Sequence, residues 1–162
     1  MQAYLKIENP GVVPPEAITT LGVSLADTAK TPGVIGQFGS GSKHSLALLL
    51  RNELAPIVYA GTLKLEFSTR PQVVTDTQAT KHFERVLVKY GGTDPVTGSS
   101  RSSTEDLGVV LDFGKLDWDD VAMALREFVS NAIDRSIRET GEWSEVSVEV
   151  VSENQVRAKA GY

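Results

Sequence analysis

The stretch "GVIGQFGSGSKHSLALLL", residues 33–50, places a glycine-rich turn directly before a run of leucines. Glycines let backbone N–H groups converge on an anion, and the positive end of the following helix favours a phosphate there. A Walker A loop would put lysine directly after Gly41, and a dinucleotide fingerprint would put glycine in place of His44, so the spacing excludes both. Two alternatives remain: a looser phosphate cradle that includes Lys43, or a turn that only leads the chain into a buried helix.

The composition bounds the class of protein. A chain of 162 residues with 41% hydrophobic and 23% charged residues is typical of one globular domain. A net charge of -5 leaves no clear nucleic-acid footprint, and the absence of cysteine excludes disulfides and thiolate metal sites. No leader and no apolar run long enough for a membrane span is present, so we expect a cytoplasmic protein. The last predicted strand stops without a terminator, as in a fragment of a longer protein or a domain with a short C-terminus.

Hydrophobic periodicity predicts an α+β fold. We expect a two-layer sandwich, in which helices cover one face of a single mixed, mostly antiparallel sheet. The predicted strands are residues 3–8, 61–70, 82–90 and 107–113, with a closing hairpin of 144–151 and 155–162. The predicted helices begin at residue 15 and span 42–54 and 117–140. Residues 91–106 are nearly free of apolar side chains, which predicts a flexible loop.

The helix predicted at 117–140 carries an unusual polar line beside its apolar stripe. Glu127, Asn131 and Asp134 follow the i, i+4, i+7 spacing and therefore lie on one side of the helix. A carboxylate and an amide in register offer the oxygen ligands that Mg²⁺ prefers and can position a water molecule. Most such triplets are only the solvated face of a helix, and this interpretation stays open at the level of the helix alone.

Together the two elements resemble a known superfamily. "LREFVSNAIDRSI" (125–137) is similar to the N-box of the GHKL ATPases, which include gyrase, a heat-shock chaperone, sensor histidine kinases and mismatch-repair ATPases. That box reads Glu, three residues, Asn-Ala, one residue, Asp. "IGQFGSGSK" (35–43) resembles the later glycine box of the superfamily, and "TLGVS" (20–24) resembles the motif that precedes it. The resemblance covers about half of the chain.

The resemblance implies a Bergerat-type ATP-binding fold with ATP and Mg²⁺ as cofactors. Glu127 would be the general base that polarises the attacking water, Asn131 would ligate Mg²⁺, and Asp134 would support this network. Residues 22–35 would form the ATP lid. The implied nucleotide-binding residues in and before the glycine box are Gly22, Ser24, Gly36, Gln37, Phe38, Gly39, Ser40, Gly41 and Lys43.

The sequence departs from the superfamily in two ways. The adenine box of the superfamily reads Asp-x-Gly-x-Gly, whereas "IENPGV" (7–12) offers Glu8, Asn9 and Gly11 as the corresponding nucleotide-binding residues. The motif order is also inverted, because the N-box comes last in this chain. A circular permutation accounts for this order and predicts that the strand after the N-box lies beside residues 3–8. Glu8 and Glu127 should then line one pocket.

Three functions are compatible with these patterns. The first is a GHKL-type module that binds ATP and hydrolyses it in a Mg²⁺-dependent reaction, driving a conformational change. A homodimer partner or an additional domain would then complete the site. The second is a non-catalytic ligand-binding or protein-interaction domain on the same fold. The third is a structural domain outside the superfamily, in which the glycines only turn the chain.

Overall fold

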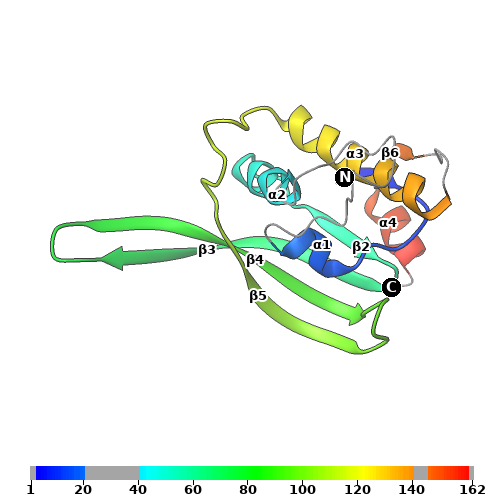
Figure 1. The fold of residues 1–162 in the computed structure, drawn as a ribbon, viewed down its shortest axis with the longest axis horizontal. Helices are drawn as coiled ribbons and strands as arrows, with labels where there is room; N and C mark the ends of the chain where they lie inside the picture. The colour runs from blue at the N-terminus through cyan, green and yellow to red at the C-terminus, as the bar shows by residue number, and fades with distance from the viewer. Residues whose placement is uncertain (1–2, 21–40, 141–145, 161–162) are drawn as a thin grey trace.

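The computed structural model describes residues 3–20, 41–140 and 146–160 (Figure 1). It shows an α+β protein whose described strands pair only in antiparallel fashion. In chain order the elements are β1 (Ala3–Glu8), α1 (Pro15–Thr19), α2 (Gly41–Arg51), β2 (Ile57–Ala60), β3 (Leu63–Thr75), β4 (Thr80–Thr93), β5 (Ser100–Val110), α3 (Val121–Thr140), β6 (Ser147–Ser152) and α4 (Glu153–Ala160).

The expectation of one sheet is wrong for the described residues. They form a four-stranded sheet in the order β2-β3-β4-β5 and a separate two-stranded sheet of β1 and β6. Short loops join the four strands into a meander, which local pairing favours. β1 and β6 come from opposite ends of the described chain, and strand alternation alone does not tell which sheet they join.

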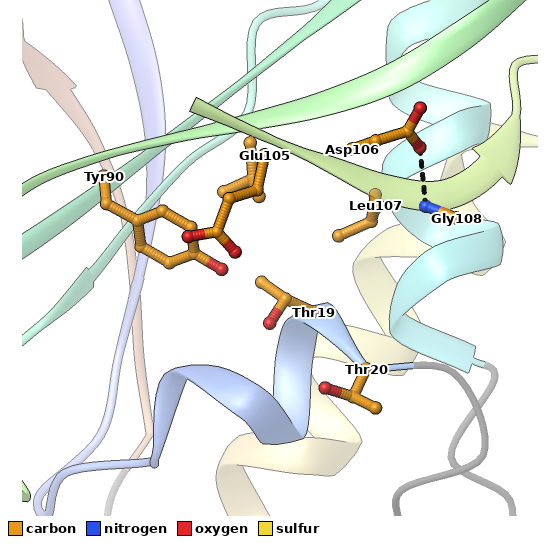
Figure 2. A pocket seen from close by; sticks show the side chains of 8 residues that line it. Thr19, Thr20, Tyr90, Glu105, Asp106, Leu107 and Gly108 are labelled. Atoms are coloured by element: carbon orange, nitrogen blue, oxygen red, sulfur yellow. Dashed lines mark hydrogen bonds between the residues drawn. The ribbon is translucent and has the colours of Figure 1, made fainter. Parts of the chain in front are cut away.

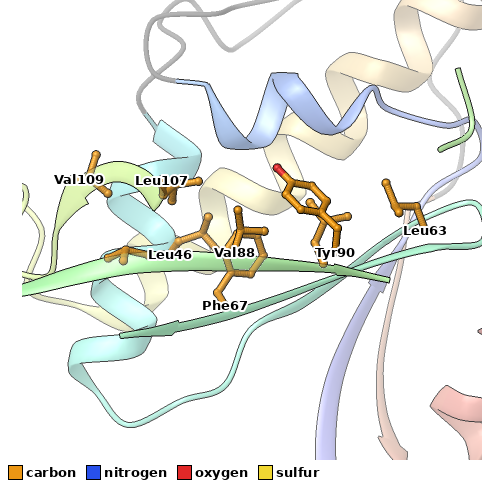
Figure 3. Close-up of a cluster of buried hydrophobic side chains, with 9 residues drawn as sticks. Leu46, Leu63, Phe67, Val88, Tyr90, Leu107 and Val109 are labelled. Atoms are coloured by element: carbon orange, nitrogen blue, oxygen red, sulfur yellow. The ribbon is translucent and has the colours of Figure 1, made fainter. Parts of the chain in front are cut away.

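The core lies on one face of the four-stranded sheet. Alternate residues of β3, β4 and β5 point to this face and meet α2 (Figure 3). The opposite face carries partly or fully exposed polar side chains such as Lys64, Glu66 and Lys89, as expected for a sheet that helices cover on one face only. The buried cluster consists of Leu46, Leu63, Leu65, Phe67, Val86, Val88, Tyr90, Leu107 and Val109.

Helix α2 lies between the sheet and α3. Leu46 packs into the sheet cluster, whereas Leu48 and Leu49 pack with Ala124 of α3. Phe128 of α3 contacts both clusters and so ties the layers together. This position explains why α2 is apolar over most of its circumference, and Figure 1 shows α2 and α3 on the same side of the sheet.

The prediction of a flexible loop at 91–106 is wrong. β4 runs through Thr93, β5 begins at Ser100, and the two strands pair across this segment. Asp94 builds the turn, because its Oδ1 accepts hydrogen bonds from the N–H groups of Val96 and Thr97 at 2.9 and 3.0 Å. Serine and threonine can form an exposed strand at the edge of a sheet, where no apolar alternation is required.

The predicted C-terminal hairpin is also wrong, because α4 follows β6 directly. Gln155 forms the return half of a capping box: its Oε1 accepts from the backbone N–H and the hydroxyl of Ser152 at 2.9 and 3.0 Å. The sequence "SEN" therefore starts a helix and is not a hairpin turn. The predicted strand at 107–113 ends earlier, at Val110, and the short strand β2 was not predicted.

The pairing expected from the permuted motif order is confirmed. β1 pairs antiparallel with β6, from Ala3 opposite Ser152 to Glu8 opposite Ser147. β6 is the strand that follows α3, the helix with the N-box-like motif. The two ends of the described chain thus meet in one sheet.

A clamp from α2 holds the turn that leads into α3. The Arg51 guanidinium donates to the backbone carbonyls of Leu111, Phe113 and Trp118 at 2.8, 3.0 and 2.8 Å. His44 stacks on the Phe113 ring at 4.3 Å between centroids, with the planes 1° apart. These contacts fix the path between β5 and α3 and thereby set where α3 lies on α2.

No helix within the described residues is long and apolar enough to cross a membrane.

Candidate functional site

The polar line of α3 is present as predicted. Asn131 Nδ2 donates a hydrogen bond to Glu127 Oε1 at 3.2 Å, one helical turn apart. Asp134 lies one turn further along and is only 5% exposed. Glu127 is half-buried and Asn131 is exposed, so only the Asp134 end of the line is buried. An ordinary solvated helix face does not bury an aspartate in this way.

The Glu127 carboxylate lies against the first residue of α2. A β-carbon added at Gly41 would collide with the Glu127 carboxyl group, so the glycine makes room for this approach. The first N–H groups of a helix lack intrahelical acceptors and carry the positive end of the helix dipole, which favours a nearby carboxylate. The two motifs, far apart in the sequence, therefore meet at the N-terminal end of α2.

Helix α2 buries polar side chains next to this contact. Ser42, Lys43 and Ser45 are buried, although the other buried side chains of α2 are apolar. Ser45 Oγ has no hydrogen-bond partner among the described residues. Burial lowers the pKa of Lys43 to about 8. Ser42 and Ser45 were not predicted as site residues. Their position as polar residues in a leucine-rich buried helix is the sequence feature that could have indicated them. Because Lys43 is 0% exposed, its contact with a phosphate stays a prediction.

The buried lysine predicts a particular pH dependence of stability. The pKa of Lys43 is about 8 in the folded protein and 10.5 for an exposed lysine, so between these values the unfolded chain binds more protons. The contribution of Lys43 to stability should therefore rise as the pH increases from 8 to 10.5. Urea unfolding of the parent and of Lys43→Met across this range should show the parent gaining stability relative to the variant. If the difference in unfolding free energy between the parent and Lys43→Met stays constant over this pH range, burial does not lower the pKa of Lys43 as assigned.

The residues of the degenerate adenine box lie at the end of β1 and in the following turn. Glu8 ends the strand and forms an ion pair with Lys6. Asn9 Nδ2 donates to the Pro10 carbonyl at 2.8 Å, and Gly11 adopts a φ of 92°, which favours glycine. Helix α3 contacts β1 as well as α2. A common pocket for Glu8 and Glu127 stays a prediction.

Several predicted nucleotide-binding residues lie outside the described parts of the chain. They include the segment 22–35, predicted as the ATP lid. Of the nucleotide-binding residues predicted in the glycine box, only Gly41 and Lys43 are described. The residues outside are Gly22, Ser24, Gly36, Gln37, Phe38, Gly39 and Ser40.

A separate cleft lies between α1 and the sheet, a site that sequence reasoning did not predict. It has a volume of about 410 Å³ (Figure 2). Hydroxyl and carboxyl groups dominate its polar lining, and burial is the main cause that raises the pKa of the Tyr90 phenol. Arg101 stacks 3.6 Å above the Tyr90 ring centroid and pairs with Glu105. The lining residues are Thr19, Thr20, Val88, Tyr90, Glu105, Asp106, Leu107 and Gly108.

The described residues contain no group of three or more histidine, aspartate or glutamate side chains placed to hold a metal ion. Comparisons with known protein families, curated proteins and solved structures found no match.

Proposed function

We propose that this chain binds ATP together with Mg²⁺ and hydrolyses it, in a site between the N-terminal end of α2 and the Glu127–Asn131 pair of α3. The observation that carries the proposal is the approach of the Glu127 carboxylate to Gly41. This approach joins the glycine-rich motif to the N-box-like motif, as one nucleotide site requires. The fold would be a permuted Bergerat fold, and the pairing of β1 with β6 supports this order.

The side chains present fit a phosphate and a hard cation. The first turn of α2 offers N–H groups to an anion, and glycine at position 41 keeps this end open to the α3 side chains. Asn131 donates a hydrogen bond from Nδ2 to Glu127, and the Asn131 carbonyl Oδ1 therefore points away from the Glu127 carboxylate. An amide oxygen is a ligand that Mg²⁺ accepts alongside phosphate oxygens. When bound, Mg²⁺ would neutralise charge on the transferred phosphoryl group.

The role of Glu127 follows from its neighbours. The hydrogen bond from Asn131 holds one oxygen of the carboxylate, and the other oxygen can accept a proton from a water molecule. Its place at the end of α2 puts this base where a terminal phosphate would meet the helix. Phosphoryl transfer depends mainly on positioning and charge stabilisation, so a fixed base and a fixed anion site suffice as the contribution of the chain.

Addition of ATP and Mg²⁺ tests the proposal directly. At a nucleotide concentration about 100 times Kd, binding to the folded state stabilises it by about 2.7 kcal/mol. For a chain of this size we expect the melting temperature to rise by about 5–10 °C. Gly41→Ala should reduce this rise, because the added β-carbon displaces the Glu127 carboxylate.

Gly91→Ala is the matched control for Gly41→Ala. A β-carbon at Gly91 meets no atom of the described residues within 4 Å, so this variant should keep the full response to nucleotide. Alanine is the better helix former, so Gly41→Ala should not unfold the protein in the absence of nucleotide. An unchanged melting temperature of the parent with ATP and Mg²⁺ would exclude nucleotide binding at this site.

A non-catalytic binding function remains the second candidate, and the cleft beside Tyr90 favours it. Its carboxylates already have partners: Asp106 binds Arg85, and Glu105 binds Arg101. The cleft can therefore hold a small polar molecule by hydrogen bonds, and its described lining residues offer no obvious nucleophile with its base. Binding of ATP at the α2–α3 site without any phosphate release would contradict the proposed hydrolysis.

A further inference from the structure

The hairpin of β3 and β4 extends far beyond the rest of the sheet (Figure 1). β2 pairs with β3 only as far as Glu66, and the last pair between β5 and β4 toward the tip is Val110 with Arg85. Beyond these points β3 and β4 continue as a two-stranded ribbon, and residues 70–82 are all exposed. We call residues 70–84 the arm. An isolated two-stranded ribbon is marginally stable in water, so a projecting arm gains from a partner.

The tip of the arm is well formed. Asp76 Oδ1 accepts from the backbone N–H groups of Gln78 and Ala79 at 2.7 and 2.8 Å. The hydroxyls of Thr75 and Thr80 lie 3.2 Å apart across the end of the ladder. The turn at the tip of the arm is therefore preorganised and would lose little conformational entropy on binding.

Proline protects one edge of the arm from strand addition. The Glu84 carbonyl points away from β3, because it accepts a hydrogen bond from the Leu111 N–H at 2.8 Å. Its cross-strand partner Pro71 therefore belongs to a pair without mutual hydrogen bonds, and the Pro71 nitrogen faces the outer edge of β3. No N–H is present there for an added strand, a common protection of sheet edges. The faces of the arm are the better contact surface.

One face of the arm combines positive charge with apolar groups. The register places Arg70, Gln72 and Val74 on the same side as Arg85, Phe83 and Lys81, respectively. Val74 is 51% exposed on this side, and Val73 is 53% exposed on the other. A basic and partly apolar face fits an acidic surface that has an exposed apolar residue of its own.

Such a surface lies in this same chain, in the turn before α3. We call residues 112–120 the acceptor segment. Leu116 is 98% exposed, and the segment carries four exposed aspartates against a single lysine. Two of these aspartates, Asp119 and Asp120, come directly before α3. Because Leu111 is bonded to Glu84, the acceptor segment begins at the base of the arm.

From this arrangement we infer that the chain forms a two-fold dimer, in which the arm of each copy lies on the acceptor segment of the other. In each chain the arm begins beside the acceptor segment. When two arms lie antiparallel, the arm of each chain can therefore reach the acceptor segment of the other, and both contacts form at once, as a closed isologous interface requires. Arg70 and Arg85 on this face already pair with Asp106, so Lys81 is the arm cation that meets the acceptor aspartates, and Val74 meets Leu116. The net charge of -5 disfavours nucleic acid as the partner of the arm. The inference does not depend on nucleotide binding.

The mass of the full chain in solution tests the dimer. Light scattering or sedimentation velocity at low salt should give twice the mass of one chain, and added salt should weaken the dimer because the exposed charges become screened. A monomer under low-salt conditions would overturn the inference. A monomer that binds single-stranded oligonucleotide through its arm would overturn it too, and would assign the arm to nucleic acid.

A pair of charge reversals tests the specific contact. Lys81→Glu and Asp119→Lys should each raise the dimer dissociation constant at least ~10-fold, because like charges then face each other twice per dimer. A mixture of the two variants should restore the dimer as a heterodimer, since both contacts again join opposite charges. Both positions are exposed, so the folds should remain intact, which circular dichroism can check.

Lys89→Glu is the matched control for the arm. Lys89 lies on the same face of β4 but within the four-stranded sheet, and its replacement changes the net charge by the same amount. This variant should dimerise like the parent. If Lys89→Glu breaks the dimer as strongly as Lys81→Glu, or if the mixed variants fail to pair, the arm and acceptor assignment is wrong.

Discussion

Glu127→Gln is expected to reduce phosphate release from ATP by about 10²–10⁴-fold, the usual contribution of a positioned general base. Glutamine keeps the length of the side chain and an oxygen that can accept from Asn131 Nδ2, so the local packing should persist. It cannot take a proton from water at neutral pH. ATP binding should therefore survive while turnover falls, measured by nucleotide-induced thermal shift and by phosphate release, respectively.

Glu53→Gln provides the matched control, because Glu53 is an exposed glutamate just beyond the opposite end of α2. We expect its phosphate release to equal that of the parent. Unchanged turnover in Glu127→Gln would mean that another group accepts the proton and that the proposed role of Glu127 is wrong. Loss of nucleotide binding together with turnover would instead assign Glu127 to the binding step.

The second large effect concerns stability. Arg51→Met should destabilise the protein by about 3 kcal/mol, because it leaves three backbone carbonyls without their charged donor. The melting temperature should fall by about 6–12 °C. The turn from Leu111 to Trp118 would also be released, and the position of α3 on α2 depends on that turn. Nucleotide binding should weaken along with stability if the site lies between these helices.

Two further variants separate the clamp from a general effect of charge. Arg51→Lys keeps the charge but lacks the planar fork that reaches several carbonyls, so it should recover only part of the lost stability. Arg126→Met removes an exposed arginine from α3 and should change the melting temperature little. Full recovery in Arg51→Lys would show that charge, and not the hydrogen-bond geometry, holds the turn.

Local patterns in the sequence were sufficient for some elements of the fold. The leucine run predicts α2, and the apolar stripe with its acidic start predicts α3, where Asp120 Oδ1 accepts from the Ala122 N–H at 2.9 Å. The inverted motif order predicts the neighbourhood of β1 and β6. Each of these inferences depends on spacing within one segment or on the order of segments, which a linear sequence contains.

Other elements differ from the sequence prediction because the same local composition is compatible with two kinds of local structure. The segment 91–106 has the polar character of a loop, yet pairing with β4 makes most of it a strand. Ser152, before α4, is compatible with a turn or with the start of a helix. The hydrogen bond from its backbone N–H to Gln155 Oε1 distinguishes the two. The arm was missed because its strands continue through residues that form no core, so alternation is weak there.

The sequence by itself determined helices α2 and α3 and the polar line from Glu127 to Asp134, because residue spacing specifies which side chains share one face of an element. Only the tertiary structure decided that Glu127 meets Gly41, that Lys43 is buried, and that Arg51 clamps the turn before α3. These contacts join segments distant in the chain. Their geometry depends on how the sheet, α2 and α3 pack as layers, and no local periodicity encodes that packing.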